Sequence, residues 1–131
     1  MYFLLNQAES RSTFVSLKKN RDFKHVYSQG KYVANELFVA YALANHFGIN
    51  RIGITVSKKV GGAVVRNRVK RRVRECVRHN NLSLQSDICT YDFVLVARKP
   101  AGELVGKGVF LHMSASLQNL FRRLGKTLAP I

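Results

Sequence analysis

The chain has 131 residues, of which 22 are Lys or Arg and 7 are Asp or Glu, so its formal net charge is +15. Because 47% of the residues are hydrophobic, the composition excludes a disordered basic tail and predicts one folded domain over residues 1–131, with the order of residues 1–15 left open. No apolar run approaches the roughly 18 residues of a membrane helix.

The first predicted helix covers residues 21–29, with Asn20 as its N-cap and Gly30 closing it in the left-handed conformation. Apolar residues occupy both faces of residues 37–44, which is typical of a strand covered on both sides. A second strand is predicted over residues 52–57 after a turn. We expect these two strands to form a hairpin.

After a glycine pair at residues 61–62 the apolar spacing becomes helical. Residues 93–97 form a short apolar run of strand length, and from Met113 the apolar residues keep a helical period up to Gly125. Residues 80–91 fit either a short strand or a loop. The expected order of elements is therefore αββαβα.

Two cysteines, Cys76 and Cys89, are too few for a disulfide framework, and their spacing matches no zinc motif. We interpret both as small core residues of a cytoplasmic protein. A charge of +15 on such a domain favours a polyanionic partner, with nucleic acid as the first candidate and an anionic membrane surface as the second.

The helix after the glycine pair carries the densest positive charge of the chain. Between Lys58 and Arg78 there are nine basic residues and one acid, Glu75, so this segment holds +8 of the +15. On a helical wheel its apolar residues fall within an arc of about 120°, which predicts docking by one narrow stripe. The stripe consists of Val65, Val69, Val73, Cys76 and Val77.

A run of charge usually forms a solvated face, but such a face usually mixes signs. Here the segment has a single acid, so neighbouring guanidiniums repel one another unless a polyanion neutralises their charge. From Arg66 onward this segment has six Arg and one Lys. Guanidinium binds phosphate through two N–H groups and stacks on bases, so the bias favours a structured nucleic acid.

The stretch Ser57–Glu75, with Arg66-Asn67-Arg68 at its centre, resembles the signature of the bacterial ribonuclease P protein component. The resemblance covers about residues 14–125. Gly62 departs from it, because the family often has Asn there, and this weakens the side-chain cap of the helix. Further similar blocks follow in the family's order at Leu17–Phe23, Phe38–Tyr41 and Val96–Pro100.

The resemblance implies the protein subunit of an endoribonuclease whose catalytic RNA removes the 5′ leader from precursor tRNA with Mg²⁺. The Mg²⁺ would be held mainly by the RNA and the substrate, and the protein alone would not be catalytic. The sequence agrees, since no carboxylates form a close pair suited to two metals and the four histidines match no catalytic motif. The implied partners are the catalytic RNA and precursor tRNA, without a membrane or a small-molecule substrate.

The resemblance also implies two binding sites. The basic helix would dock on the catalytic RNA through Arg66, Asn67, Arg68, Lys70, Arg71, Arg72 and Arg74. A cleft between the first helix and the sheet would take the single-stranded leader, whose bases could stack on aromatic rings without sequence readout. Its residues would be Phe23, Tyr27, Val39 and Tyr41, with Lys24, Lys58 and Lys59 along the RNA backbone. Without the resemblance, we would interpret these aromatic residues as core.

The expected fold is an α/β (α+β) two-layer sandwich with a central sheet of about four strands. The second strand, the basic helix and the third strand would form a βαβ unit. Its crossover is left-handed in the family, against the usual rule, so this expectation rests on the resemblance alone. A ribosomal protein or another non-catalytic RNA-binding module would share the charge, size and helix, and only the ordered blocks separate the two readings.

Overall fold

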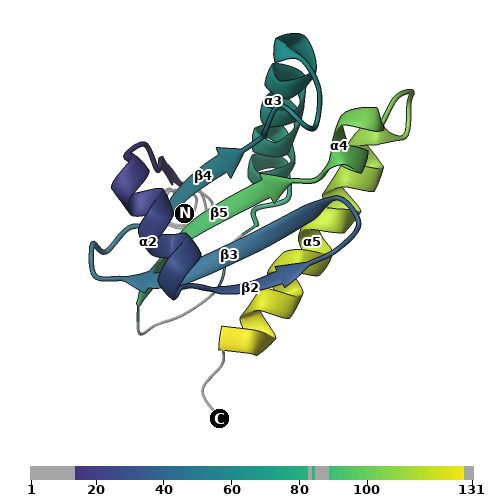
Figure 1. Cartoon of the computed structure of the whole chain (residues 1–131). Coiled ribbons are helices and arrows are strands. Elements are labelled where there is room, and N and C mark those ends of the chain that lie inside the picture. Colours follow the sequence, from purple (N-terminus) through teal and green to yellow (C-terminus); the bar gives the residue numbers. More distant parts are fainter. Residues whose placement is uncertain (1–13, 83, 85–88, 129–131) are drawn as a thin grey trace, which may run out of the picture.

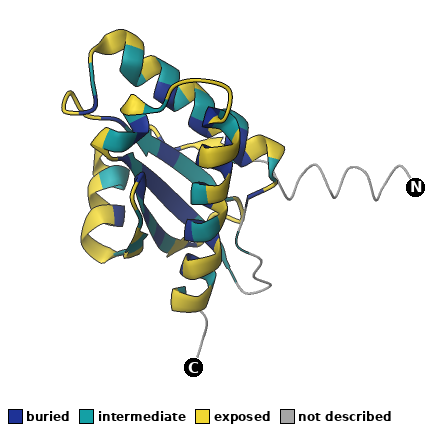
Figure 2. Cartoon of the chain, turned by 90° about the vertical axis from the view of Figure 1, so that its right-hand side faces the viewer, coloured by how far each residue is buried: buried dark blue, intermediate teal, exposed yellow. Residues whose placement is uncertain are grey.

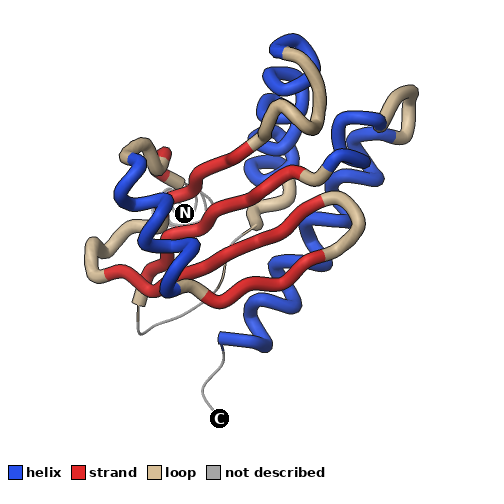
Figure 3. Tube along the Cα trace, viewed as in Figure 1, coloured by secondary structure: helices blue, strands red, loops and turns tan. Residues whose placement is uncertain are grey.

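Five strands form one mixed sheet with helices on both of its faces (Figure 1). This computed structural model describes residues 14–82, 84 and 89–128. The strands are β1 (Val15–Ser16), β2 (Lys31–Ala34), β3 (Phe38–Asn45), β4 (Arg51–Thr55) and β5 (Thr90–Ala97), in the spatial order β1-β4-β5-β3-β2. The helices are α2 (Asn20–Gln29), α3 (Ala63–His79), α4 (Lys99–Glu103) and α5 (Val109–Leu128). Figure 3 shows the same arrangement by type of element.

The main core lies between one face of the sheet and the helices α3 and α5 (Figure 2). Side chains alternate along each strand, so every second residue of β3 and β5 enters this core. The predicted stripe of α3 is confirmed, because Val69, Val73, Cys76 and Val77 are buried and Val65 packs against them. The largest fully buried side chains from the sheet and α5 are Phe38, Phe93, Leu95, Met113, Leu117, Leu120 and Leu124.

Helix α2 covers part of the opposite face of the sheet. Val26 of α2 is buried with Leu17 and Val94, and these three residues form a second, smaller core. The expected cover on both sides of β3 is therefore incomplete, because Val39 and Tyr41 remain half-buried beside α2. This partly covered face is where the aromatic residues of α2 meet the sheet.

The predicted hairpin between residues 37–44 and 52–57 is wrong, because β5 lies between β3 and β4. β3 pairs antiparallel with β5 along its whole length, and β4 pairs parallel with β5. The hairpin partner of β3 is β2, a short strand that the sequence pattern does not reveal. The predicted βαβ unit of β4, α3 and β5 is confirmed, whereas its left-handed sense stays a prediction.

The ends of α2 differ from the sequence prediction. Asn20 is its first residue, and Lys19 occupies the N-cap position without a side-chain hydrogen bond. Gly30 has φ −78°, so the left-handed closure is wrong. Glycine is needed there for space, because a Cβ would lie 2.6 Å from the carbonyl oxygen of Val26 and 2.9 Å from that of Ala42.

The order αββαβα is incomplete, since β1, β2 and α4 are added and the sheet has five strands rather than about four. Helix α5 continues past Gly125 to Leu128. Between α3 and Thr90 the described residues contain no strand, and residues 83 and 85–88 lie outside the description, as do residues 1–13. No described helix has the length and apolar character needed to span a membrane.

Only one of the two cysteines is a core residue. Cys76 is buried beneath α5, where its Sγ lies 3.4 Å from the Oγ of Ser114, and burial raises the pKa of the Cys76 thiol. Cys89 is half-buried. The interpretation of both as core is thus confirmed for Cys76 alone.

Candidate nucleic-acid interface

Helix α3 carries its basic side chains outside the core, and no carboxylate that the structure describes neutralises them. Both ion pairs among the described residues belong to Arg51 of β4. Arg72 donates a hydrogen bond to the carbonyl oxygen of Leu104 at 3.4 Å, and this acceptor is not a carboxylate. Of the residues predicted to bind the catalytic RNA, Asn67, Arg71 and Arg74 are exposed, whereas Arg66, Arg68, Lys70 and Arg72 are half-buried.

In the first turns of α3, some polar groups have no partner within the part of the chain that the structure describes. The Nε atoms of Arg66 and Arg68 are buried and have no hydrogen-bond partner among the described residues. Gly62 is the N-cap and provides no side-chain cap, and the first turn contains no acid. Because unpaired buried donors are costly and a helix N-terminus attracts anions, this end of α3 is suited to an external acceptor such as phosphate.

Four aromatic rings form a continuous path from α2 across β3 to the edge strand β2. The ring centroid of Tyr27 lies 6.5 Å from that of Phe23 and 5.0 Å from that of Tyr41, and the Tyr32 ring lies 5.4 Å from the Tyr41 ring. Tyr27 is 38% exposed and Tyr32 62% exposed. We call Phe23, Tyr27, Tyr41 and Tyr32 the aromatic path.

The remaining residues predicted for the cleft lie on β3, on α2 and in the turn after β4. Val39 lies two residues from Tyr41 on the same face of β3 and is half-buried, and Lys24 is exposed on α2. Lys58 and Lys59 are exposed in the turn after β4. That turn follows the end of β4 at which the Tyr27 hydroxyl lies 2.8 Å from the Oγ1 of Thr55. Lys58 and Lys59 therefore follow the end of β4 that Tyr27 contacts, whereas Lys24 belongs to the same helix as Phe23 and Tyr27.

Sequence reasoning missed Tyr32 and Thr55. Tyr32 joins the aromatic path only because β2 pairs with β3, which places Tyr32 opposite Tyr41. The short run Tyr32-Val33 favours a strand but is too brief for a periodic signal. Thr55 fixes the Tyr27 ring through its hydroxyl group, a contact between residues 28 positions apart that no local pattern predicts.

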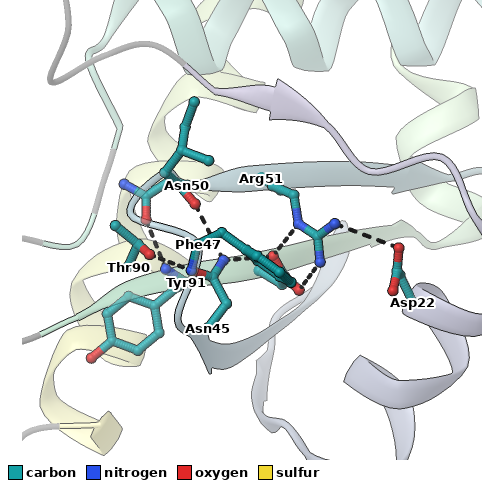
Figure 4. A network of polar contacts seen from close by, with 9 residues as sticks. Asp22, Asn45, Phe47, Asn50, Arg51, Thr90 and Tyr91 are labelled. Carbon is teal, nitrogen blue, oxygen red and sulfur yellow. Dashed lines mark hydrogen bonds and ion pairs between the residues drawn. The ribbon is translucent and has the colours of Figure 1, made fainter.

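A polar network fixes the first turn of α2 to the sheet (Figure 4). Arg51 donates to both carboxylate oxygens of Asp92, from Nε at 2.7 Å and from Nη2 at 2.6 Å, and its Nη1 lies 3.5 Å from Oδ2 of Asp22 on α2. Asn45 donates to Asp92 at 2.7 Å, and the Phe47 ring stacks 4.4 Å from the guanidinium carbon. The hydrogen bond to Asp92 is the main reason why the pKa of Arg51 is raised.

Acidic and imidazole groups do not converge into a metal or catalytic site within residues 14–82, 84 and 89–128. No three His, Cys, Asp or Glu side chains come together there. Asp22 and Asp92 both contact Arg51 instead of a shared open position. The four histidines are all exposed: His25, His46, His79 and His112.

The α/β sandwich, the unneutralised basic helix and the aromatic path together define a nucleic-acid-binding protein. The Ribonuclease P family model matches residues 12–125. The chain is 41% identical over 110 residues to the ribonuclease P protein component of Clostridium botulinum strain 657, covering 83% of this chain and 93% of that protein. It is 45% identical over 108 residues to that of Bacillus velezensis, covering 82% and 86%.

Solved structures give the same result. The ribonuclease P protein of Staphylococcus aureus superimposes with a TM-score of 0.70 at 36% identity, over 85% of this chain and 95% of that one. That of Thermotoga maritima gives 0.69 at 34% identity, over 82% and 96%. The chain belongs to the ribonuclease P protein component family, the protein subunit of the ribonuclease P endoribonuclease in tRNA 5′-leader processing. The reading as a ribosomal protein is thereby disfavoured.

Proposed function

We propose that this chain binds the catalytic RNA of ribonuclease P through α3 and the 5′ leader of precursor tRNA through the aromatic path. One observation carries the proposal: both surfaces meet at the same end of the sheet. Tyr27 contacts Thr55 where β4 ends, and the chain then runs through Lys58 and Lys59 into the N-terminus of α3. A leader on the aromatic path would thus lead directly towards an RNA held by α3.

The leader site recognises a single strand rather than a sequence. Aromatic rings accept the face of any base, and stacking on one ring is worth about 1–3 kcal/mol per base. The path offers Tyr27 and Tyr32 as exposed rings, with Tyr41 half-buried between them. Lys24, Lys58 and Lys59 supply positive charge for the phosphates beside it.

The α3 site neutralises phosphates of a folded RNA, and the RNA carries the chemistry. Guanidiniums on several sides of one helix suit a partner that surrounds it. We place Mg²⁺ on the catalytic RNA and the substrate, because no three His, Cys, Asp or Glu side chains among the described residues come together to hold an ion. We place the complex in the cytoplasm, where a reduced thiol such as that of Cys76 persists.

Reconstitution tests the proposed function directly. With a bacterial ribonuclease P RNA at low Mg²⁺, the protein is expected to restore 5′ processing of precursor tRNA, because it supplies positive charge and leader contacts that the RNA lacks. The measurement is the single-turnover cleavage rate with and without protein, and the protein alone is the control. A folded protein that leaves the rate of an active RNA unchanged would contradict the proposal.

Salt dependence tests the role of α3. Replacing Arg71 with Ala should weaken binding to the catalytic RNA and lower the slope of log affinity against log salt by about one, because one phosphate contact is lost. Arg122→Ala is the matched control, since Arg122 is also exposed but lies on α5. Its slope should equal that of the wild-type protein. An unchanged slope for Arg71→Ala would place Arg71 on a solvated face.

A further inference from the structure

A cavity of about 550 Å³ lies beside β4 at the outer edge of the sheet. β1 covers only the first part of this edge, pairing Val15 with Arg51 and Ser16 with Ile52. The amide of Leu17 donates to the carbonyl oxygen of Ile52 at 2.8 Å. Because the backbone of a strand repeats every two residues, the N–H and C=O groups of Ile54 face the same side, where no described strand pairs with them.

The walls of the cavity are largely apolar. α2 and α3 lie on opposite faces of the sheet (Figure 1), and residues of both helices line the cavity beside β4. Ile52, Ile54 and Phe14 line it on the side of the main core, as does Val77 of α3. Phe23 of α2 lines it on the opposite side. The volume of the cavity lies within the range of small-ligand pockets. Its aromatic and aliphatic walls suit a flat ring.

The mouth of the cavity is positively charged. Arg74 and Arg78 lie one turn apart on α3, both are exposed, and both line the cavity. Neither forms an ion pair with a carboxylate that the structure describes. Two adjacent guanidiniums of this kind match the oxygens of a phosphate group.

We propose that this cavity receives one unpaired nucleotide of the catalytic RNA, with its base against Ile52, Ile54 and Val77 and its phosphate on Arg74 and Arg78. The unpaired backbone of Ile54 provides one donor and one acceptor for the polar edge of the base. The inference rests on the proposed function, which makes the catalytic RNA the partner of α3. The site shares Phe23 with the aromatic path but not Tyr27, Tyr32 or Tyr41.

An open strand edge can also pair with a strand of another protein copy. Charge argues against that occupant here, because each copy carries +15 and the mouth of the cavity is itself basic. A nucleotide offers a contact to every part of the cavity. Its base packs on the apolar walls and hydrogen-bonds the backbone of Ile54, and its phosphate pairs with the guanidiniums. RNA is therefore the occupant that the observations favour.

Filling the cavity tests the proposal. Ser16→Phe would place a ring in the cavity from exposed β1 without removing charge, and Val15→Phe is the matched control, because Val15 is exposed on the same strand but does not line the cavity. Adenosine 5′-monophosphate, adenosine and inorganic phosphate are titrated into isotope-labelled protein and followed by NMR. The nucleotide should shift the signals of Ile54 and of Arg74 and Arg78, at least tenfold more weakly in Ser16→Phe than in Val15→Phe.

Adenosine alone should bind more weakly than the nucleotide, because it lacks the phosphate. Inorganic phosphate alone should not change the chemical shift of Ile54. Shifts that Ser16→Phe does not change, or that phosphate alone reproduces at Ile54, would overturn the proposal. A concentration-dependent dimer in sedimentation that Ser16→Phe disrupts would also overturn it, in favour of a second copy.

The holoenzyme separates this inference from the proposed function. Ser16→Phe should bind the catalytic RNA about tenfold more weakly than Val15→Phe, because the new ring occupies the space of the base. If the wild-type protein stimulates processing while Ser16→Phe binds the RNA as tightly as Val15→Phe, the cavity proposal fails alone. If the wild-type protein does not stimulate processing, the proposed function fails, and the nucleotide titration still decides what the cavity binds.

Discussion

Replacing Asp92 with Ala is expected to lower the free energy of unfolding by about 3–5 kcal/mol. Asp92 is 4% exposed and accepts hydrogen bonds from both Arg51 and Asn45. Without Asp92, the partly buried guanidinium of Arg51 lacks its main partner. An unpaired buried charge lowers the free energy of unfolding by more than the ion pair itself contributes to it. Urea unfolding followed by circular dichroism measures the change.

Asp22→Ala is the control for this prediction, because it removes the second, longer ion pair of the same guanidinium. Its cost should be at most about 1 kcal/mol, since the 3.5 Å contact is partly solvated. The double variant Asp92→Ala, Arg51→Ala should lose less than the sum of the two single variants, because no buried charge is then left over. Equal effects of Asp92→Ala and Asp22→Ala would contradict a structural role for the network.

The elements that sequence alone predicts are those with a long local period. α3 was identified by a stripe at helical spacing, and β3 and β5 by apolar runs of strand length, because these patterns lie within one element. The pairing of β3 and β4 was predicted wrongly because neighbouring strands usually pair. Here β5 enters between them, and its register, with Asn45 opposite Thr90, joins residues 45 positions apart.

The candidate site divides in the same way. Phe23 and Tyr27 share one edge of a helix, and Val39 and Tyr41 share one face of a strand, so local spacing places each pair. Nothing local places Tyr32 beside Tyr41, since that contact needs the register of β2. The sequence also does not predict the polar network, because its members come from α2, β4 and β5 and meet only in the folded chain.

Removing the Tyr41 ring should weaken binding of precursor tRNA by about tenfold and leave mature tRNA binding unchanged. Tyr41 lies between Tyr27 and Tyr32, so its loss interrupts the aromatic path, and one stacked base is worth about 1–3 kcal/mol. Phe23→Ala should act in the same direction. The measurement is the affinity of the reconstituted holoenzyme for precursor tRNA with its leader and for mature tRNA.

Phe47→Ala controls for the loss of an exposed aromatic ring, because Phe47 stacks on Arg51 and lies outside the aromatic path. It should bind both RNAs as the wild-type protein does. Tyr32→Ala should weaken binding only for leaders long enough to reach β2, since Tyr32 is at the far end of the path. Equal losses for precursor and mature tRNA in Tyr41→Ala would mean that this ring supports the fold rather than the leader, and the unfolding free energy of the variant would show the same loss.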